Sequence, residues 1–183
     1  MSIYLSIDLD YWKGSRKPER FLNRVISLRR PVAVRREHHE LLGHMNRYSY
    51  DCLINIDWHS DLVENDMKLP CLDDGTWGNH IRAKNRNHYL WIYPSDSCVA
   101  GPDNMSSTGY CNAWANKNPF LVRNPKQVCG WERVSKRKQF ITEREMDEVV
   151  AVGICYSPSF TSIAYNERVG QHMKKLGLQT FWG

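Results

Sequence analysis

Two short polar segments carry the side chains best suited to chemistry, and each follows an apolar run, at 3–7 and 52–56. Their polar side chains are spaced two residues apart, as Asp8 and Asp10 in the first segment and Asp57, His59 and Asp61 in the second. Side chains repeat every two residues along an extended strand, so each set is expected to leave on one side. Carboxylates and an imidazole gathered in this way make both segments candidate metal ligands.

The apolar runs that precede these segments are typical of buried strands. The runs 3–7, 52–56 and 149–155 are short and nearly continuous, whereas 31–35 and 89–93 are weaker candidates. Continuous rather than alternating apolar runs indicate strands that are covered on both faces. Both polar segments then lie at the carboxyl ends of strands, where ligands bind in open α/β sheets.

Helical patterns separate the predicted strands. Apolar residues fall at helical spacing over 18–30 and 38–48, and a third helix is expected over 166–176, closed by Gly177. Strands that alternate with helices predict an α/β protein with a mostly parallel sheet. The stretch 65–138 is rich in Gly, Asn, Pro and Trp, so we expect a long functional loop region or insertion within a single domain, 1–183.

Two neighbouring parallel strands would bring four carboxylates and one imidazole to one point. Unpaired carboxylates at that density repel each other and raise one another's pKa values. Two divalent cations balance four negative charges, so the charge count predicts a dinuclear metal centre. Oxygen-rich ligands favour Mn²⁺ or Mg²⁺, with Zn²⁺ and Fe²⁺ as alternatives.

A further histidine is expected to complete the metal ligands. Glu37, His38, His39 and Glu40 follow the predicted strand 31–35 and open a helix. Adjacent helical side chains point about 100° apart, so one of His38 and His39 is expected to be a ligand, and the pattern does not decide which. The alternative is that neither binds metal.

Four of these segments together resemble the arginase/deacetylase superfamily, and most closely its small peptide-arginase branch. The similar segments, about 50 residues in all with their surroundings, have the sequences SIDLDYW (6–12), REHHELL (36–42), IDWHSDL (56–62) and ICYSPSFT (154–161). The resemblance implies a three-layer α/β/α fold with an arginase-like sheet. The strand order is expected to be permuted, because the D-x-D segment precedes D-x-H-x-D in this chain and follows it in arginases.

The resemblance also implies a ligand set for two Mn²⁺ ions per chain. Two carboxylates, Asp8 and Asp57, are expected to bridge the ions. The other ligands form two sets, Asp61 with His38 or His39, and Asp10 with His59. The implied reaction converts arginine to ornithine and urea, through attack on the guanidinium carbon by water that the paired ions activate.

The resemblance implies further roles for Asp10 and His80, and position along the chain suggests other site residues. Asp10 is expected to hydrogen-bond the attacking water, and His80 is the candidate proton shuttle, with an ordinary loop histidine as the alternative. Asn79, Tyr156 and Ser157 are candidates for substrate binding, although Pro158 after them could simply end the strand. The acid that holds the guanidinium stays open among Glu64, Asp66, Asp73 and Asp74. The shortness of the chain predicts an open pocket, which suits an arginine-containing peptide or a small guanidino compound.

Two other functions compete with this interpretation. A phosphatase of the haloacid dehalogenase type would use Asp8 as nucleophile, Asp10 as acid and Asp73 with Asp74 as magnesium ligands, but it leaves His59 unexplained. A non-catalytic binding module would use the basic stretch 123–138, which has one aromatic residue, Trp131. For that stretch a solvated loop is favoured over a nucleic-acid interface.

The composition limits the classes of protein to which the chain can belong. The chain has 183 residues, 42% hydrophobic and 25% charged, with a net charge of +5, which is typical of a globular domain. No apolar run approaches the length of a membrane span, and the first residues do not resemble a signal peptide. The six cysteines form no C-x-x-C pair, so we expect reduced thiols in a cytoplasmic protein.

Overall fold

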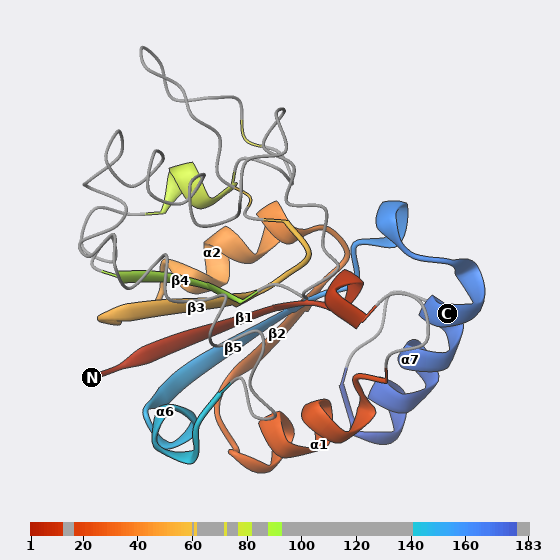
Figure 1. Ribbon diagram of the computed structural model, residues 1–183, viewed down its shortest axis with the longest axis horizontal. Helices are drawn as coiled ribbons and strands as arrows, with labels where there is room; N and C mark the ends of the chain where they lie inside the picture. Colours follow the sequence, from red (N-terminus) through yellow and green to blue (C-terminus); the bar gives the residue numbers. More distant parts are fainter. Residues whose placement is uncertain are drawn as a thin grey trace.

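The computed structural model of the protein describes residues 1–12, 17–59, 61, 72, 77–81, 88–92 and 141–178. This part of the chain is an α/β structure with a five-stranded sheet (Figure 1). The strands are β1 (Ile3–Asp8), β2 (Val32–Arg35), β3 (Cys52–Ile56), β4 (His88–Ile92) and β5 (Val149–Cys155). All neighbouring strands are parallel, which confirms the predicted α/β class.

The sheet has the order β2-β5-β1-β3-β4, with β1 at its centre. Ile7 of β1 lies level with Ile56 of β3 on one side and with Ile154 of β5 on the other. The carboxyl ends of these three strands therefore meet at the same edge of the sheet. The prediction that the strands before Asp8 and Asp57 are neighbours is confirmed.

The central strands are buried throughout. All six residues of β1 and all five of β3 are buried, as their nearly continuous apolar sequences indicate. Beside β1, Gly153 of β5 leaves room for two side chains: an added Cβ would lie 2.7 Å from the Tyr4 hydroxyl and 3.0 Å from Leu41 Cδ1. The edge of the sheet that carries the polar segments therefore stands on a closely packed core.

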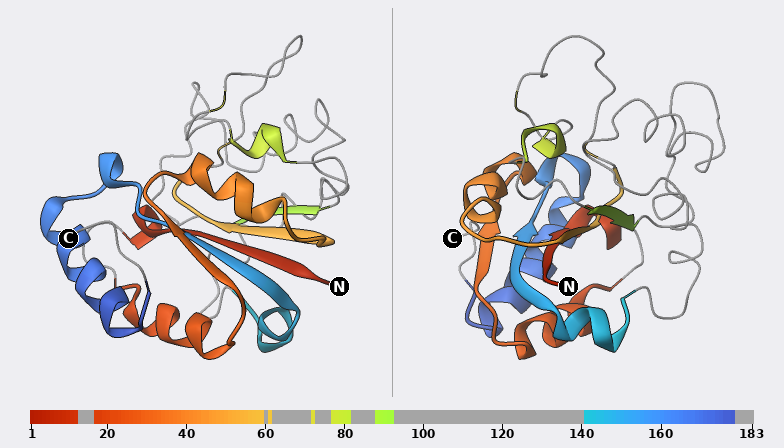
Figure 2. Two further views of the ribbon diagram at one scale, coloured as in Figure 1. Left: turned by 180° about the vertical axis from the view of Figure 1, so that it is seen from behind. Right: turned by 90° about the vertical axis from the view of Figure 1, so that its left-hand side faces the viewer.

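Helices lie between the strands along the chain. The α-helices are α1 (Glu19–Ser27), α2 (Leu42–Met45), α6 (Glu143–Asp147) and α7 (Ile163–Lys175), and 3-10 helices are η1 (Leu9–Trp12), η2 (His38–Leu41), η3 (Trp77–His80) and η5 (Pro158–Phe160). Figures 1 and 2 show α1 and α7 side by side, and α2 on the other side of the strands. A hydrogen bond of 2.9 Å between His172 Nε2 and Asn23 Oδ1 joins α7 to α1.

Several element boundaries differ from the predicted ones. The helix expected over 166–176 begins three residues earlier, because Ser162 caps it by accepting a hydrogen bond from the amide of Tyr165. The helix expected over 38–48 is η2 followed by α2 and ends at Met45. Helix α6 was not predicted, although Thr142 and Glu145 form a capping box that the sequence spells out.

Other expectations concern the remainder of the chain. Most of the stretch 65–138, including Asp73, Asp74 and the basic segment 123–138, lies outside the described residues, as do Glu64 and Asp66. Within the described ranges, none of the helices combines the length and the apolar character that crossing a bilayer requires. Both cysteines that the structure describes, Cys52 and Cys155, are free thiols.

The strand order contains a switch point of the kind that binds ligands. From β1 the chain crosses to β2 on one side, whereas from β3 it continues to β4 on the other side. In open α/β sheets, ligands bind beyond the carboxyl ends of the strands at such a point. Asp8 ends one of the two strands that flank it, β1, and Asp57 follows the other, β3.

Candidate metal centre

The carboxyl ends of β1 and β3 are built in the same way. The amide of Asp10 donates to Asp8 Oδ1 at 2.9 Å, and the amide of His59 donates to Asp57 Oδ1 at 2.9 Å. An aspartate that accepts a hydrogen bond from the amide two residues later forms an Asx turn. Both polar segments therefore turn at their first aspartate.

These turns correct the predicted backbone, because neither polar segment continues as an extended strand. Strand β1 ends at Asp8 and the 3-10 helix η1 begins at Leu9, whereas β3 ends before Asp57 and Asp61 adopts a left-handed φ of 52°. The side chains converge because the chain turns, and the alternation of side chains along a strand does not place them.

One group of side chains surrounds the imidazole of His38. The Nδ1 atom of His38 lies 3.2 Å from Asp8 Oδ2, 3.0 Å from Asp57 Oδ2 and 3.0 Å from Asp61 Oδ2. We call Asp8, His38, Asp57 and Asp61 the His38 cluster. All four side chains are buried, and that of His38 is 1% exposed.

A second group adjoins the first and shares Asp57. Asp10 Oδ2 lies 3.3 Å from His59 Nδ1, and Asp57 Oδ1 lies 4.0 Å from the same nitrogen. We call Asp10, Asp57 and His59 the His59 cluster. Its aspartates are buried, but the His59 side chain is 42% exposed, so this cluster reaches the surface. Asp57 directs one oxygen to each cluster.

Neighbouring side chains hold the ligand atoms of the His38 cluster in place. Ser6 Oγ lies 2.7 Å from His38 Nε2, on the side of the ring away from the carboxylates. If Ser6 accepts the Nε2 hydrogen, Nδ1 is free to bind a cation. Trp77 Nε1 donates to Asp61 Oδ2, and the Trp77 ring lies 4.4 Å from the ring of His38.

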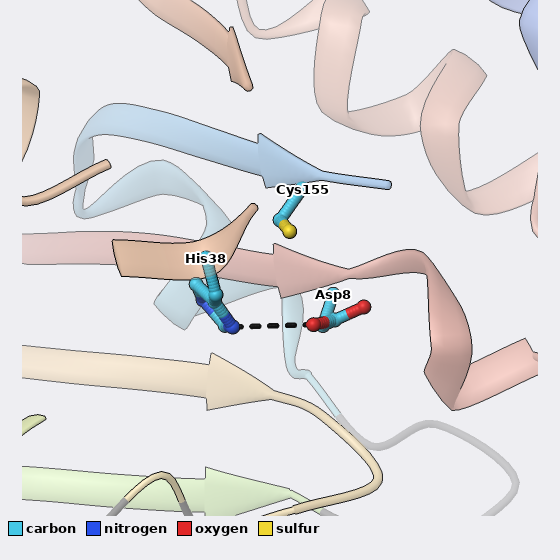
Figure 3. A group of neighbouring side chains, drawn as sticks. All are labelled: Asp8, His38 and Cys155. Atoms are coloured by element: carbon cyan, nitrogen blue, oxygen red, sulfur yellow. Dashed lines mark ion pairs between the residues drawn. The ribbon is translucent and has the colours of Figure 1, made fainter. Parts of the chain in front are cut away.

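Residues at the end of β5 and just after it support Asp8 from the other side. The Ser157 hydroxyl donates to Asp8 Oδ2, and Cys155 Sγ lies 3.1 Å from the Ser157 oxygen. Figure 3 shows Asp8, His38 and Cys155 gathered at the strand ends. Burial raises the pKa of Cys155 well above its usual range, so its side chain stays a neutral thiol beside the carboxylates.

The electrostatics of the cluster favour a bound cation. Burial, together with Asp10 and Asp57, raises the pKa of Asp8 to about 7, and burial likewise raises the pKa values of Asp57 and Asp61. Burial alone would lower the pKa of His38, but the surrounding carboxylates outweigh it and raise that pKa well above 6.5. A divalent cation would relieve the same repulsion among the buried carboxylates.

The spacing of the donor atoms also fits a hard divalent cation. Adjacent ligands of an octahedral ion with bonds of about 2.1 Å stand about 3.0 Å apart. In the His38 cluster the separations from Nδ1 to the three carboxylate oxygens are 3.0–3.2 Å. His38, Asp57 and Asp61, whose donor atoms all lie within 4.8 Å of one another, can therefore hold one ion, and the longer separations in the His59 cluster leave that group more open.

The structure distinguishes the two candidate histidines. His38 is buried in the cluster, whereas His39 is half-buried and belongs to none of the potential metal-binding groups formed by the described side chains. Consecutive residues on a helix point in different directions, as expected. The inclusion of His39 among the candidate ligands is therefore not supported.

Of the other predicted site residues, Tyr156 and Ser157 lie differently from expectation. Ser157 and Tyr156 are buried, so they offer no surface to a substrate, and Ser157 instead supports Asp8. His80 is half-buried and belongs to none of the groups that the described side chains form. Asn79 lies in η3, but its side chain is outside the described part of the chain.

Sequence reasoning assigned no role to Ser6, Trp77 or Cys155. Two signals could have pointed to the first two: Ser6 precedes Asp8 by one period of the strand, and Trp77 adjoins the candidate His80. Comparison with known proteins adds no further residue, since no family model, curated protein or solved structure matches the chain.

Proposed function

We propose that the protein is a binuclear metal-dependent hydrolase that acts on the guanidinium group of arginine. The observation that carries this proposal is the convergence of four buried aspartates and two histidines at the carboxyl ends of β1 and β3. Structural salt bridges seldom gather so many buried carboxylates around one imidazole, because the desolvation cost is high. The resemblance of four segments to the peptide-arginase branch supports the choice of reaction.

The two clusters would each hold one ion. The His38 cluster offers three carboxylates and one imidazole, and the His59 cluster offers two carboxylates and one imidazole, with Asp57 shared. This mixture of oxygen and nitrogen donors suits Mn²⁺ or Mg²⁺, with Zn²⁺ and Fe²⁺ as alternatives. When bound, paired ions supply Lewis-acid activation of water.

Residues of the His59 cluster are suited to orient the reacting groups. Asp10 Oδ2 is buried and accepts no hydrogen bond from the described residues, so it can accept one from an attacking water. The Asp10 carboxylate is fixed by its other oxygen, which accepts from the amide of Trp58 at 3.2 Å. His59, which is partly exposed beside it, is placed to contact the substrate.

The reaction consumes one water for each guanidinium. The water oxygen forms a bond to the guanidinium carbon, the bond from that carbon to the side-chain nitrogen breaks, and the products are urea and the amine of ornithine. Both protons of the water end on the side-chain nitrogen, which leaves as the ammonium group of ornithine, while urea keeps the four hydrogens of the two terminal nitrogens. We propose His80 for the transfer to the amine.

The exposure of His59 favours a substrate presented from outside the sheet, such as an arginine in a peptide, with a small guanidino compound as the alternative. We also propose that the fold is the arginase-like three-layer type and that the protein acts in the cytoplasm. The helices on both sides of the sheet support the first of these proposals (Figure 2).

Metal analysis combined with a urea assay tests the proposal. The purified protein is loaded separately with Mn²⁺, Mg²⁺, Zn²⁺ or Fe²⁺, dialysed, and analysed for metal per chain and for urea released from arginine and from arginine peptides. We expect two ions per chain and urea release. Absence of metal after loading would overturn the metal centre, whereas bound metal without urea release would overturn only the reaction.

A further inference from the structure

The segment after β5 places an aromatic side chain beside the exposed histidine of the candidate site. The ring centroids of Phe160 and His59 are 5.0 Å apart, and the rings are inclined at 55°. Phe160 is 46% exposed and is one of four large apolar side chains that the described residues leave exposed. An exposed aromatic ring that packs beside a histidine of the candidate site is placed to contact a molecule that binds there.

Phe160 borders the open side of the candidate site. Of the six side chains in the two clusters, the five other than His59 are at most 6% exposed. A substrate that approaches along the exposed edge of His59 therefore passes the ring of Phe160.

The backbone that carries Phe160 is fixed to the metal-binding residues. Ser157 adopts a left-handed φ of 43°, which is uncommon outside glycine, while its hydroxyl donates to Asp8 Oδ2. The carbonyl of Ser157 accepts from the amide of Phe160 at 3.0 Å. Beyond it, the Thr161 hydroxyl donates to Oδ1 of the buried Asn166 at 2.7 Å. The position of Phe160 is thus coupled to that of Asp8.

From this geometry we infer that Phe160 is a specificity-determining residue that packs against the side chain of a bound arginine. An aromatic ring suits both parts of that side chain, since it packs on the methylene stem and attracts the planar guanidinium through its π face. This inference rests on the proposed function for the identity of the substrate. It assigns recognition to a residue outside the two clusters.

The test compares three variants of the Mn²⁺-loaded protein. Phe160→Leu keeps an apolar side chain but removes the aromatic face, and Phe160→Tyr keeps the face. Ile163→Ala is the matched control, because Ile163 is a 78% exposed apolar residue three positions away. Calorimetry measures the binding of a blocked arginine peptide, its neutral citrulline counterpart and free arginine, and metal content is measured for every variant.

We expect Phe160→Leu to weaken binding of the arginine peptide about 3- to 30-fold, the range for an aromatic–cation contact. Phe160→Tyr and Ile163→Ala should bind like the parent protein, all variants should keep their metal, and the citrulline peptide should bind more weakly. Free arginine should show the same dependence on Phe160, and the ratio of its affinity to that of the peptide identifies the preferred form.

Unchanged binding by Phe160→Leu, equal weakening by Ile163→Ala, or absence of arginine-peptide binding to the parent protein would overturn the inference. Urea release is measured separately. Phe160-dependent binding without urea would sustain the recognition role and reject the proposed reaction. Urea release together with binding that does not depend on Phe160 would support the proposed reaction and reject the recognition role.

Discussion

The two clusters of the candidate centre differ in their contact with solvent. The His38 cluster is enclosed, with three carboxylate oxygens 3.0–3.2 Å from His38 Nδ1 and a supporting tryptophan, whereas the His59 cluster has longer separations and a histidine that is 42% exposed. A cation in the enclosed cluster would be surrounded by protein ligands. The open cluster leaves room for water and substrate, which is the arrangement that distinguishes catalytic from structural metal sites.

The residue shared by both clusters gives the largest expected effect. Asp57→Asn removes one charge from each cluster while keeping the shape of the side chain. Loss of a residue that merely supports a ligand costs 10- to 100-fold in affinity or activity, so loss of a shared ligand should cost more than about 100-fold. Metal analysis after dialysis should show no more than one ion per chain, and urea release should be abolished.

The matched control for this change is Asp147→Asn. Asp147 is exposed in α6 before β5, and it belongs to neither cluster. This variant should bind two ions. If Asp57→Asn also kept two ions and its activity, the shared role of Asp57 would be wrong.

Substitution of the exposed histidine tests whether the two clusters bind their ions independently. His59→Asn should leave the His38 cluster intact, because the carboxylates around His38 Nδ1 belong to Asp8, Asp57 and Asp61. We expect one Mn²⁺ per chain, with the electron paramagnetic resonance spectrum of an isolated ion in place of a coupled pair, and loss of urea release. The substitution His38→Asn should instead weaken the enclosed site, and identical spectra for the two variants would contradict the division into clusters.

A smaller effect is expected from the tryptophan that supports the enclosed cluster. Trp77→Phe removes the hydrogen bond to Asp61 Oδ2 and keeps a ring beside His38. Affinity for the ion of the His38 cluster should fall about 10- to 100-fold, with little change in the affinity for the ion of the His59 cluster. Titration with a fluorescent chelator measures both affinities. Trp91→Phe, which removes a hydrogen bond to the backbone oxygen of Asp57, serves as the control.

The sequence predicts the scaffold of this centre better than its details. Nearly continuous apolar runs mark the central strands, because a strand covered on both faces has no solvent-facing side that would require alternating polar residues. Each acidic segment follows such a run, so the convergence of Asp8 and Asp57 needs only that β1 and β3 are neighbours. That assumption is confirmed by the parallel pairing of the two strands.

Details that depend on distant contacts were not predictable. The choice between His38 and His39 depends on the rotation of a short helix against the sheet, and the sequence fixes only that they point apart. The roles of Trp77 and Ser157 depend on segments 16 residues from Asp61 and 149 residues from Asp8. The Asx turns override the strand pattern because a local side-chain acceptor competes with extended backbone.

The smallest effect concerns the packing beneath the enclosed cluster. Gly153 of β5 faces Tyr4 and Leu41, and Leu41 lies in the same 3-10 helix as His38. In Gly153→Ala the new methyl group would lie 2.7 Å from the Tyr4 hydroxyl and 3.0 Å from Leu41 Cδ1, so both must shift. Overpacking of this kind costs about 1–3 kcal/mol in the free energy of unfolding, which urea denaturation can measure.

The control for Gly153→Ala is Gly43→Ala. No atom lies within 4 Å of an added Cβ at Gly43, which is in α2, so this variant should be as stable as the parent protein or up to about 1 kcal/mol more stable. Because the added methyl group at position 153 pushes on η2, it should also lower the affinity for the ion of the His38 cluster more than the affinity for the ion of the His59 cluster. An equal loss of affinity for both ions would show that the two clusters respond as one unit. The enclosed and the open cluster would then differ only in their exposure to solvent.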